Sequence, residues 1–311
     1  MDRINLEISI GSIKFKNPIF TAAGPVGFGS SFADFFPLDI LGGLVSRSLT
    51  YEARLGNKPP RLWETPSGMM NNIGFQNPGL EAFTRNFYPS LKELDTNLII
   101  SIYGNQIEEY KMAASGISSL PKVNALEVNT YLDYEQYRKL KPSGYLRRVG
   151  QITRAVKQTT HLPVWIKLMP DTGNLEEAAG LAESEGADAV VVANTFRGMA
   201  LDTQTGKSRL GSGTGGLSGA AIKPLALLRV WEVSRAVSIP VIGAGGIVTP
   251  SDAVEFMLAG ARAVEIGSGN FVDPCTIPNI IDGIKEYLSA HGIMDIKDLT
   301  GTAKVSAKRH K

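Results

Sequence analysis

Two clusters of glycines follow short apolar runs in the last third of the chain. Gly245-Gly246 comes after Val241–Ala244, and Gly267-Ser268-Gly269 ends the run that starts at Ala263. Because glycine has no Cβ atom, backbone N–H groups at such points can close around the oxygens of a phosphate group. The alternative is that these glycines only relieve crowding. Two clusters after successive runs favour phosphate binding, which by itself does not separate a flavin from a sugar phosphate.

A lysine and several asparagines stand at similar places. Lys167 ends the apolar run Val164–Ile166, where an unpaired ammonium would be costly to bury. We expect it to face an anion or an electron-rich ring, and a reduced flavin would serve. The alternative is a structural lysine that reaches solvent. Asn129 and Asn194 end two other runs, and amides around one cavity suit a planar polar ligand.

The composition excludes other kinds of site. The 311 residues include 32 Lys plus Arg and 30 Asp plus Glu, and a net charge of +2 gives no bulk attraction to nucleic acid or an anionic membrane. The single cysteine, Cys275, excludes an intrachain disulfide and a cysteine-built metal site, and it favours a cytoplasmic location. The three histidines form no apparent triad or metal site, and no apolar run is long enough to cross a membrane.

The elements that must position these residues alternate between short apolar runs and stretches of helical periodicity. Continuous apolar character indicates strands buried on both faces of a parallel sheet. We therefore predict an α/β fold, a single (β/α)₈ TIM barrel over residues 1–311. The strands are expected at Ile19–Ala23, Leu44–Arg47, Leu98–Tyr103, Ala125–Asn129, Val164–Leu168, Ala189–Asn194, Val241–Ala244 and Ala263–Gly267, and later helices at Gly144–Thr159, Leu175–Ser184, Pro224–Ala236 and Pro250–Ala259.

Three further segments complete this organisation. Leu6–Ile10 and Ile13–Phe15 flank Gly11-Ser12 and predict a hairpin that closes the bottom of the barrel. Long connections follow the second strand, from Ser48 to Asn97, and the sixth, from Phe196 to Leu217, and such loops are usually functional. Sites in these barrels form where strands end, so the glycines, Lys167 and the asparagines should meet there.

Several motifs also match a known family. They are Asn17-Pro18-Ile19, Ala23-Gly24, Gly56–Arg61, Glu64–Gly79, Lys167, Asn194-Thr195, Gly215–Gly219, Ile239–Gly243, Gly245-Gly246 and Asn270-Phe271. On these residues the chain resembles the class 1 dihydroorotate dehydrogenases over nearly its whole length. The resemblance is greatest to the subclass whose flavin subunit pairs with an iron–sulfur electron-transfer subunit.

The resemblance implies an enzyme that moves a hydride from a ring carbon to flavin N5 while a base removes the neighbouring proton. It assigns flavin mononucleotide (FMN) to Ala23, Arg47, Ser48, Asn129, Lys167, Ala193, Gly219, Gly245, Gly246, Gly267 and Ser268. It assigns the carboxylate and ring amides of the substrate to Asn71, Asn129, Asn194 and Thr195. No metal site is implied.

Two departures from the family pattern concern the chemistry. Arg47 stands where the family has a lysine, and its fork-shaped guanidinium can clamp a carboxylate differently. Leu132 stands at the position of the family's cysteine base and cannot accept a proton. Tyr131, Tyr134 and Asp133 are the candidate replacements, and a tyrosine would need a lowered pKa or would act as an acid in the reductive direction. The alternative is that this segment simply begins a helix.

The leading interpretation is an FMN-dependent oxidoreductase similar to dihydroorotate dehydrogenase, with Lys167, Tyr131 and Tyr134 as catalytic candidates. The rivals are a paralogue acting on a different small unsaturated acid or amide, a non-catalytic flavoprotein subunit, and a phosphate-binding isomerase or synthase without flavin. With one cysteine, the chain cannot build its own iron–sulfur centre, so electrons leave through a partner or a diffusible oxidant. The resemblance implies a homodimer and an iron–sulfur/FAD electron-transfer subunit.

Overall fold

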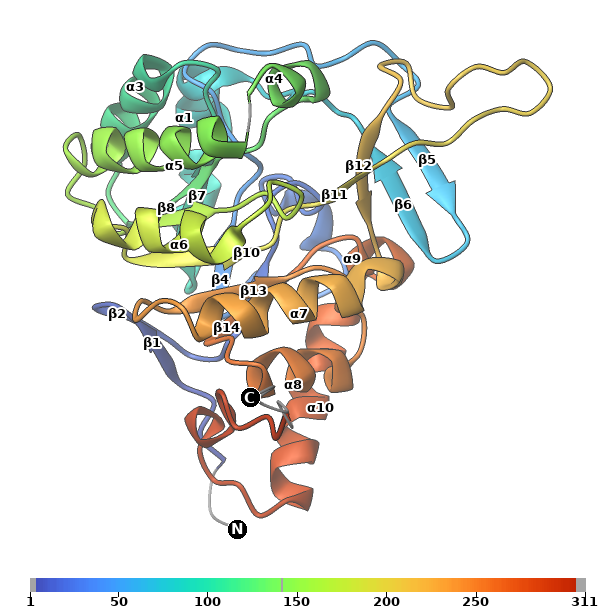
Figure 1. The fold of residues 1–311 in the computed structure, drawn as a ribbon. Coiled ribbons are helices and arrows are strands. Elements are labelled where there is room, and N and C mark those ends of the chain that lie inside the picture. Colours follow the sequence, from blue (N-terminus) through green and yellow to red (C-terminus); the bar gives the residue numbers. More distant parts are fainter. Residues whose placement is uncertain (1–3, 141, 306–311) are drawn as a thin grey trace, which may run out of the picture.

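Eight short parallel strands close into a barrel in the computed structural model, which describes residues 4–140 and 142–305 (Figure 1). Around the barrel the strand order is β10-β13-β14-β3-β4-β7-β8-β9. This confirms the predicted (β/α)₈ barrel, while the extent of the domain over 1–311 stays a prediction. The strands are β3 (Ile19–Thr21), β4 (Gly43–Val45), β7 (Asn97–Ile102), β8 (Val123–Asn129), β9 (Val164–Lys167), β10 (Ala189–Val192), β13 (Val241–Ala244) and β14 (Ala263–Ile266).

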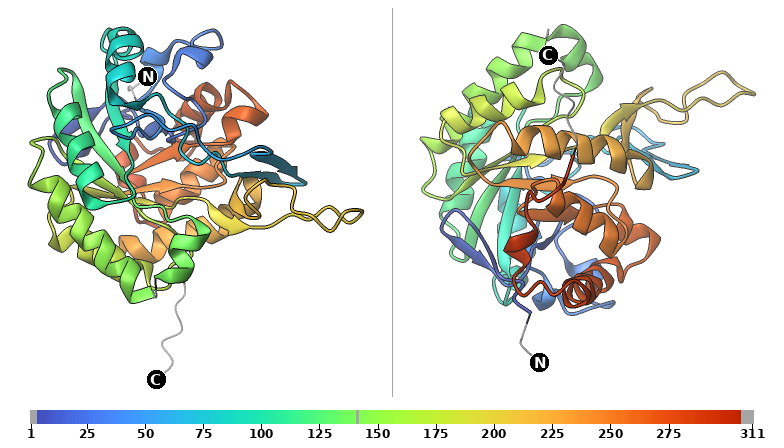
Figure 2. Two further views of the ribbon diagram at one scale, coloured as in Figure 1. Left: turned by 90° about the horizontal axis from the view of Figure 1, so that it is seen from above. Right: turned by 60° about the horizontal axis from the view of Figure 1, so that its bottom comes forward.

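Helices form an outer layer around the strands, as the view from above shows (Figure 2). They are α3 (Ile107–Ser118), α5 (Pro142–Lys157), α6 (Leu175–Ser184), α7 (Lys223–Ser234), α8 (Pro250–Leu258) and α10 (Thr276–Ala290). Sequence periodicity predicts α5, α6, α7 and α8, but it does not predict α3 and α10. Pro278 and Gly283 interrupt the helical pattern of α10, although Pro278 lies in the first turn, where proline is tolerated.

Local capping fixes where α8 begins, next to the glycines that follow β13. The Thr249 side chain accepts a hydrogen bond from Asp252 N, and the Asp252 carboxylate accepts one from Thr249 N. Pro250 occupies the first turn, where its missing N–H costs nothing. The loop between β13 and α8 is therefore held at its helical end by its own sequence.

The predicted hairpin is present and lies at the amino ends of the barrel strands. It consists of β1 (Ile8–Ile10) and β2 (Ile13–Phe15), paired antiparallel. The buried Phe15 ring lies 4.8 Å from Phe20 of β3 and 6.0 Å from Trp165 of β9, measured between ring centroids. These three aromatic rings fill the bottom of the barrel, so the polar chemistry is left to the opposite end.

The two long connections are folded, which the sequence patterns do not predict. The first contains β5 (Leu62–Thr65), β6 (Gly68–Asn71), α1 (Gly79–Asn86) and α2 (Tyr88–Leu91), and the second contains β11 (Phe196–Gly198) and β12 (Gly215–Ser218). The four strands pair in the order β11-β12-β6-β5 into a sheet that projects beside the barrel (Figures 1 and 2). This pairing joins segments about 145 residues apart, and local periodicity carries no signal for it.

We predict that Phe15→Ala lowers the free energy of unfolding by about 3–5 kcal/mol, because it empties a packed aromatic site. The matched control is Lys14→Ala, on the exposed face of the same strand, which should change it by less than about 0.5 kcal/mol. Urea unfolding of the two variants measures the difference. Equal effects would show that the hairpin does not seal the barrel.

Candidate functional site

A cavity of about 400 Å³ opens at the carboxyl ends of the barrel strands. Its size is that of a small-molecule site. The lining residues come from the ends of the barrel strands and from both long connections, so the projecting sheet forms one of its walls. The place agrees with the rule that sites of these barrels form where the strands end.

Most of the residues singled out from the sequence line this cavity. From the predicted cofactor set these are Ala23, Arg47, Ser48, Asn129, Lys167, Ala193, Gly245, Gly246, Gly267 and Ser268. From the predicted substrate set these are Asn71, Asn129, Asn194 and Thr195. Of the candidate bases, Tyr131 and Asp133 line the cavity. Two predicted residues, Gly219 and Tyr134, are not brought into the lining.

Local structure explains both exceptions. Gly219 has a φ of +99°, and a Cβ atom there would lie 2.4 Å from the Cα atom of Gly68, so it serves the close approach of two loops. Tyr134 is the first residue of α4 (Tyr134–Lys139) and its side chain is 45% exposed. Asp133 caps that helix by accepting a hydrogen bond from Gln136 N, which turns Tyr134 away from the cavity. Tyr134 therefore lies outside the cavity lining in this structure.

Leu132, which the resemblance predicts at the position of a base, has apolar surroundings in the structure. Leu132 is 1% exposed and packs in the hydrophobic core, and its N–H contacts the sulfur of Met169 at 2.9 Å. It is not among the residues that line the cavity. The site therefore offers no proton acceptor at this position.

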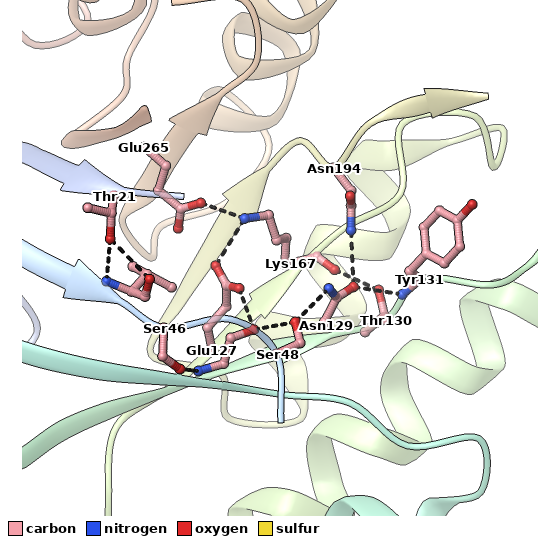
Figure 3. Close-up of polar contacts among 12 residues, drawn as sticks. Thr21, Ser46, Ser48, Glu127, Asn129, Thr130, Tyr131, Lys167, Asn194 and Glu265 are labelled. Carbon is pink, nitrogen blue, oxygen red and sulfur yellow. Dashed lines mark hydrogen bonds and ion pairs between the residues drawn. The ribbon is translucent and has the colours of Figure 1, made fainter. Parts of the chain in front are cut away.

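Lys167 is held between two buried carboxylates inside the barrel (Figure 3). Its Nζ atom lies 2.5 Å from Oε2 of Glu265 on β14 and 3.2 Å from Oε2 of Glu127 on β8. Lys167 and Glu265 both line the cavity. The anion expected beside Lys167 is thus supplied in part by the protein, and two of its three N–H bonds are used, which leaves one for a ligand.

Lys167, Glu127 and Glu265 form a trio of buried ionisable groups, in which burial and the charges of the neighbours have opposing effects. Burial opposes the charge on Lys167, but Glu127 and Glu265 together raise the pKa of Lys167 above its ordinary value. Burial, followed by repulsion from Glu127, raises the pKa of Glu265 well above its ordinary value, and Lys167 only partly opposes this. Lys167 is therefore positively charged at neutral pH, and Glu265 binds a proton more tightly than an ordinary glutamate does.

A chain of hydrogen bonds leads from this trio across the barrel mouth to the asparagines (Figure 3). Glu127 accepts from Ser101 Oγ at 2.8 Å, and Ser101 Oγ lies 2.8 Å from Ser48 Oγ. Ser48 accepts from Asn129 Nδ2 at 3.2 Å, and Asn129 Oδ1 accepts from Asn194 Nδ2 at 3.0 Å. Four strand ends are tied together in this way, which fixes the amides before any ligand binds.

An aromatic wall faces this polar chain. The ring of Phe75 stacks on Tyr103 with centroids 3.7 Å apart, and Tyr131 meets Phe75 edge-on at 5.8 Å. Burial raises the pKa of Tyr131 to about 12, and nearby Arg197 only partly opposes this. Tyr131 is therefore a phenol at neutral pH, so it is a proton donor rather than a base in its resting form.

Arg47 brings a second cation to the cavity. Among the described residues, its guanidinium makes two long hydrogen bonds, to the carbonyl oxygens of Gln76 at 3.4 Å and Gly24 at 3.5 Å. Burial lowers its pKa, and no carboxylate of the described residues lies within ion-pair distance. A half-buried guanidinium with weak partners suits a carboxylate ligand.

The glycines after β13 form a tight turn at the cavity rim. Gly245 and Gly246 have φ angles of +126° and +76°, which other residues rarely adopt. A Cβ atom on Gly246 would lie 2.6 Å from Lys223 N. Gly267 and Ser268 also line the cavity, and glycine-rich loops of this kind suit a phosphate group because backbone N–H groups can approach it closely.

Sequence reasoning missed Glu127 and Glu265, which dominate the electrostatics of the site. The available signal is a carboxylate inside an otherwise apolar strand, as in Leu126-Glu127-Val128 and Val264-Glu265-Ile266. A buried carboxylate demands a partner, and Lys167 is the nearby cation. The aromatic wall gave no such signal, since Phe75 and Tyr103 meet only through the fold of the first long connection.

Two other kinds of site were also sought in residues 4–140 and 142–305. This part of the chain holds no group of three or more His, Cys, Asp or Glu side chains arranged to bind a metal ion. None of its helices has the length and apolar character needed to span a membrane.

The fold and the site together define a (β/α)₈ barrel that presents a buried cation and two glycine-rich loops to one cavity. Comparison with known sequences specifies the class further. The sequence profile of the family described as dihydroorotate dehydrogenase matches residues 5–288. The chain belongs to the dihydroorotate dehydrogenase family, whose members are flavoprotein oxidoreductases that act on a CH–CH bond.

Full-length relatives support this assignment. The chain is 41% identical over 301 residues to a protein of Bacteroides fragilis and 43% identical over 303 residues to one of Thermodesulfovibrio yellowstonii. A relative in Desulforamulus reducens is 43% identical over 301 residues. Each alignment covers 96–97% of this chain and 99% of the relative. All three relatives are named dihydroorotate dehydrogenase B (NAD(+)), catalytic subunit.

We predict that Lys167→Met lowers the free energy of unfolding by about 3–5 kcal/mol, because it leaves buried carboxylates without a counter-ion. The loss should grow as pH rises, because the charge of Lys167 partly opposes the raised pKa of Glu265, and without it the folded variant holds that proton more tightly than folded wild type does. The control, Lys157→Met, removes a half-exposed ion pair with Asp188 and should cost less than about 1 kcal/mol. A pH-independent loss in urea unfolding would contradict the proposed charge balance.

Proposed function

We propose that the protein is an FMN-dependent catalytic subunit that oxidises dihydroorotate to orotate, a step of pyrimidine biosynthesis. The observation that carries this proposal is the cavity in which Lys167 and the glycines after β13 and β14 share one lining with Asn71, Asn194 and Thr195. The named function of the relatives supports the choice of substrate.

The residues present fit FMN. Gly246, Gly267 and Ser268 would hold its phosphate through backbone N–H groups, and Lys167 would lie beside its ring system. When bound, FMN supplies the acceptor for a hydride from the substrate. The remaining N–H of Lys167 can hydrogen-bond to the ring, and its charge stabilises negative charge that develops there.

The asparagines divide between binding and positioning. Asn129 Oδ1 already accepts from Asn194 Nδ2 and from Tyr131 N, so Asn129 mainly positions its neighbours. Asn71 makes one long hydrogen bond, at 3.4 Å to Gly216 O, and its amide is the more available for a substrate. Thr195 and the guanidinium of Arg47 complete a set that can bind a carboxylate and ring amides.

We propose that Tyr131 transfers the proton to or from the substrate carbon. Its ring lies in the cavity wall, and its Oη atom makes no hydrogen bond to the described residues. In the oxidative direction its phenolate would take the proton from the substrate carbon. In the reductive direction its phenol would give the proton, and solvent would restore it.

The raised pKa of Tyr131 favours a second candidate function, the reduction of a small unsaturated acid. With the proton already on Oη, the reductive direction needs no prior deprotonation. A hydride from reduced flavin would reach one carbon of the C=C bond and the Tyr131 proton its neighbour. Arg47 and the apolar Leu132 are the further features that separate this chain from the family pattern.

We also propose a partner subunit. The relatives are named catalytic subunits of an NAD(+)-linked enzyme, which implies a second chain that passes electrons on. The single cysteine of this chain excludes an iron–sulfur centre of its own, so an iron–sulfur/FAD electron-transfer subunit is the proposed partner and a homodimer the proposed core.

We predict that the purified protein is yellow, with FMN absorption near ~450 nm, and that dihydroorotate bleaches this band without oxygen. Turnover with an artificial acceptor measures the same reaction in steady state. A colourless protein that ignores added FMN would sink the flavin assignment. The second candidate function is selected if the protein is yellow and dihydroorotate does not reduce its flavin. In that case an unsaturated acid should reoxidise the flavin after it has been reduced chemically.

We predict that Tyr131→Phe slows flavin reduction or reoxidation by substrate about 10²–10⁴-fold, the usual contribution of a general acid or base. FMN content should stay unchanged, because the ring and its packing on Phe75 remain. Tyr134→Phe is the matched control and should behave as wild type, since its side chain is exposed outside the cavity. Stopped-flow absorbance of both variants decides, and an unchanged rate in Tyr131→Phe would remove this residue from the mechanism.

A further inference from the structure

Glu265 has no part in the reaction as described so far. It is 1% exposed and lines the cavity, and its Oε2 atom lies 2.5 Å from Lys167 Nζ. Its other oxygen, Oε1, is buried and has no hydrogen-bond partner among the described residues. A buried carboxyl oxygen without a partner is costly as part of an anion.

The two carboxylates that share Lys167 are not equivalent. Glu127 accepts hydrogen bonds from both Lys167 and Ser101. Farther along the same hydrogen-bond chain, Asn194 donates to Asn129 and Asn129 donates to Ser48. Glu265 accepts from Lys167 alone. Hydrogen bonds to a carboxylate stabilise its ionised form, so Glu265, with a single donor and an unpartnered oxygen, is poorly stabilised as an anion.

Within residues 4–140 and 142–305, the charged groups that act on Glu265 are Lys167 and Glu127. The partners of Glu265 on the adjacent strands are Ala244 of β13 and Phe20 of β3, which do not titrate. The charged groups that face it across the barrel are Lys167 of β9 and Glu127 of β8. Burial and the repulsion from Glu127 raise the pKa of Glu265 well above its ordinary value.

We propose that Glu265 is a positioning residue that sets the charge Lys167 presents to a flavin in the cavity. When Glu265 is neutral, Glu127 alone balances Lys167. When Glu265 ionises, a second carboxylate outweighs the ammonium, and the trio becomes negative. Negative charge beside a flavin opposes its reduction, so the reduction potential of the flavin should fall as Glu265 loses its proton. This inference rests on the FMN binding proposed above.

The test is the reduction potential of the bound flavin, measured against reference dyes from about pH 6 to about pH 10, a range that includes the highest values known for buried glutamates. The isosteric variant Glu265→Gln keeps the contact with Lys167 and cannot ionise. We expect equal potentials for wild type and variant at the acidic end and a lower potential for wild type at the alkaline end. At intermediate pH, reduction of the flavin in wild type should be accompanied by uptake of as much as about one extra proton, which binds to Glu265.

Glu185→Gln is the matched control, since Glu185 pairs with Arg154 on the outer face of the barrel, and it should follow wild type at every pH. Parallel curves for Glu265→Gln and wild type over the whole range would overturn the inference. If Glu265→Gln fails to bind flavin, the wild-type curve decides, because it must fall more steeply than that of free FMN on the alkaline side. A colourless wild type would instead refute the proposed FMN binding, which keeps the two failures distinct.

Discussion

One buried ammonium organises the polar end of this barrel. Below it, Phe15, Phe20 and Trp165 pack into an aromatic base that closes the barrel at its amino end. Lys167 can be buried because Glu127 and Glu265 approach it from two other strands. The burial of the two glutamates in turn depends on Lys167. The three strands β8, β9 and β14 are therefore held together by ionisable groups that no single strand could bury without its partners.

The hydrogen-bond chain that starts at Glu127 extends this order to the rim. Ser101, Ser48, Asn129 and Asn194 have fixed orientations because each donor finds an acceptor in the next residue. A preorganised rim of this kind loses little entropy when a planar ligand binds. Tyr131 joins this hydrogen-bond chain through its backbone N–H, which donates to Asn129, at the end away from Glu127.

The sequence was a good guide to the barrel and a partial guide to the site. Continuous apolar runs and the residues that follow them predicted the strands and most of the cavity lining, because parallel strands end at one edge of a barrel. Tyr134 could not be excluded from spacing alone, since its direction depends on the capping of α4 by Asp133. Glu127 and Glu265 were overlooked because they interrupt apolar runs, and the aromatic wall depends on the folding of a long connection. Pairings over such distances follow from the whole structure rather than from any local pattern.

The central claim is that this cavity places a flavin beside Lys167. A crystal structure of the protein with bound FMN tests it most directly. The account predicts the flavin ring within hydrogen-bonding distance of Lys167 Nζ, with its phosphate at Gly246, Gly267 and Ser268. A flavin bound elsewhere, or a ring separated from Lys167 by other side chains, would contradict it.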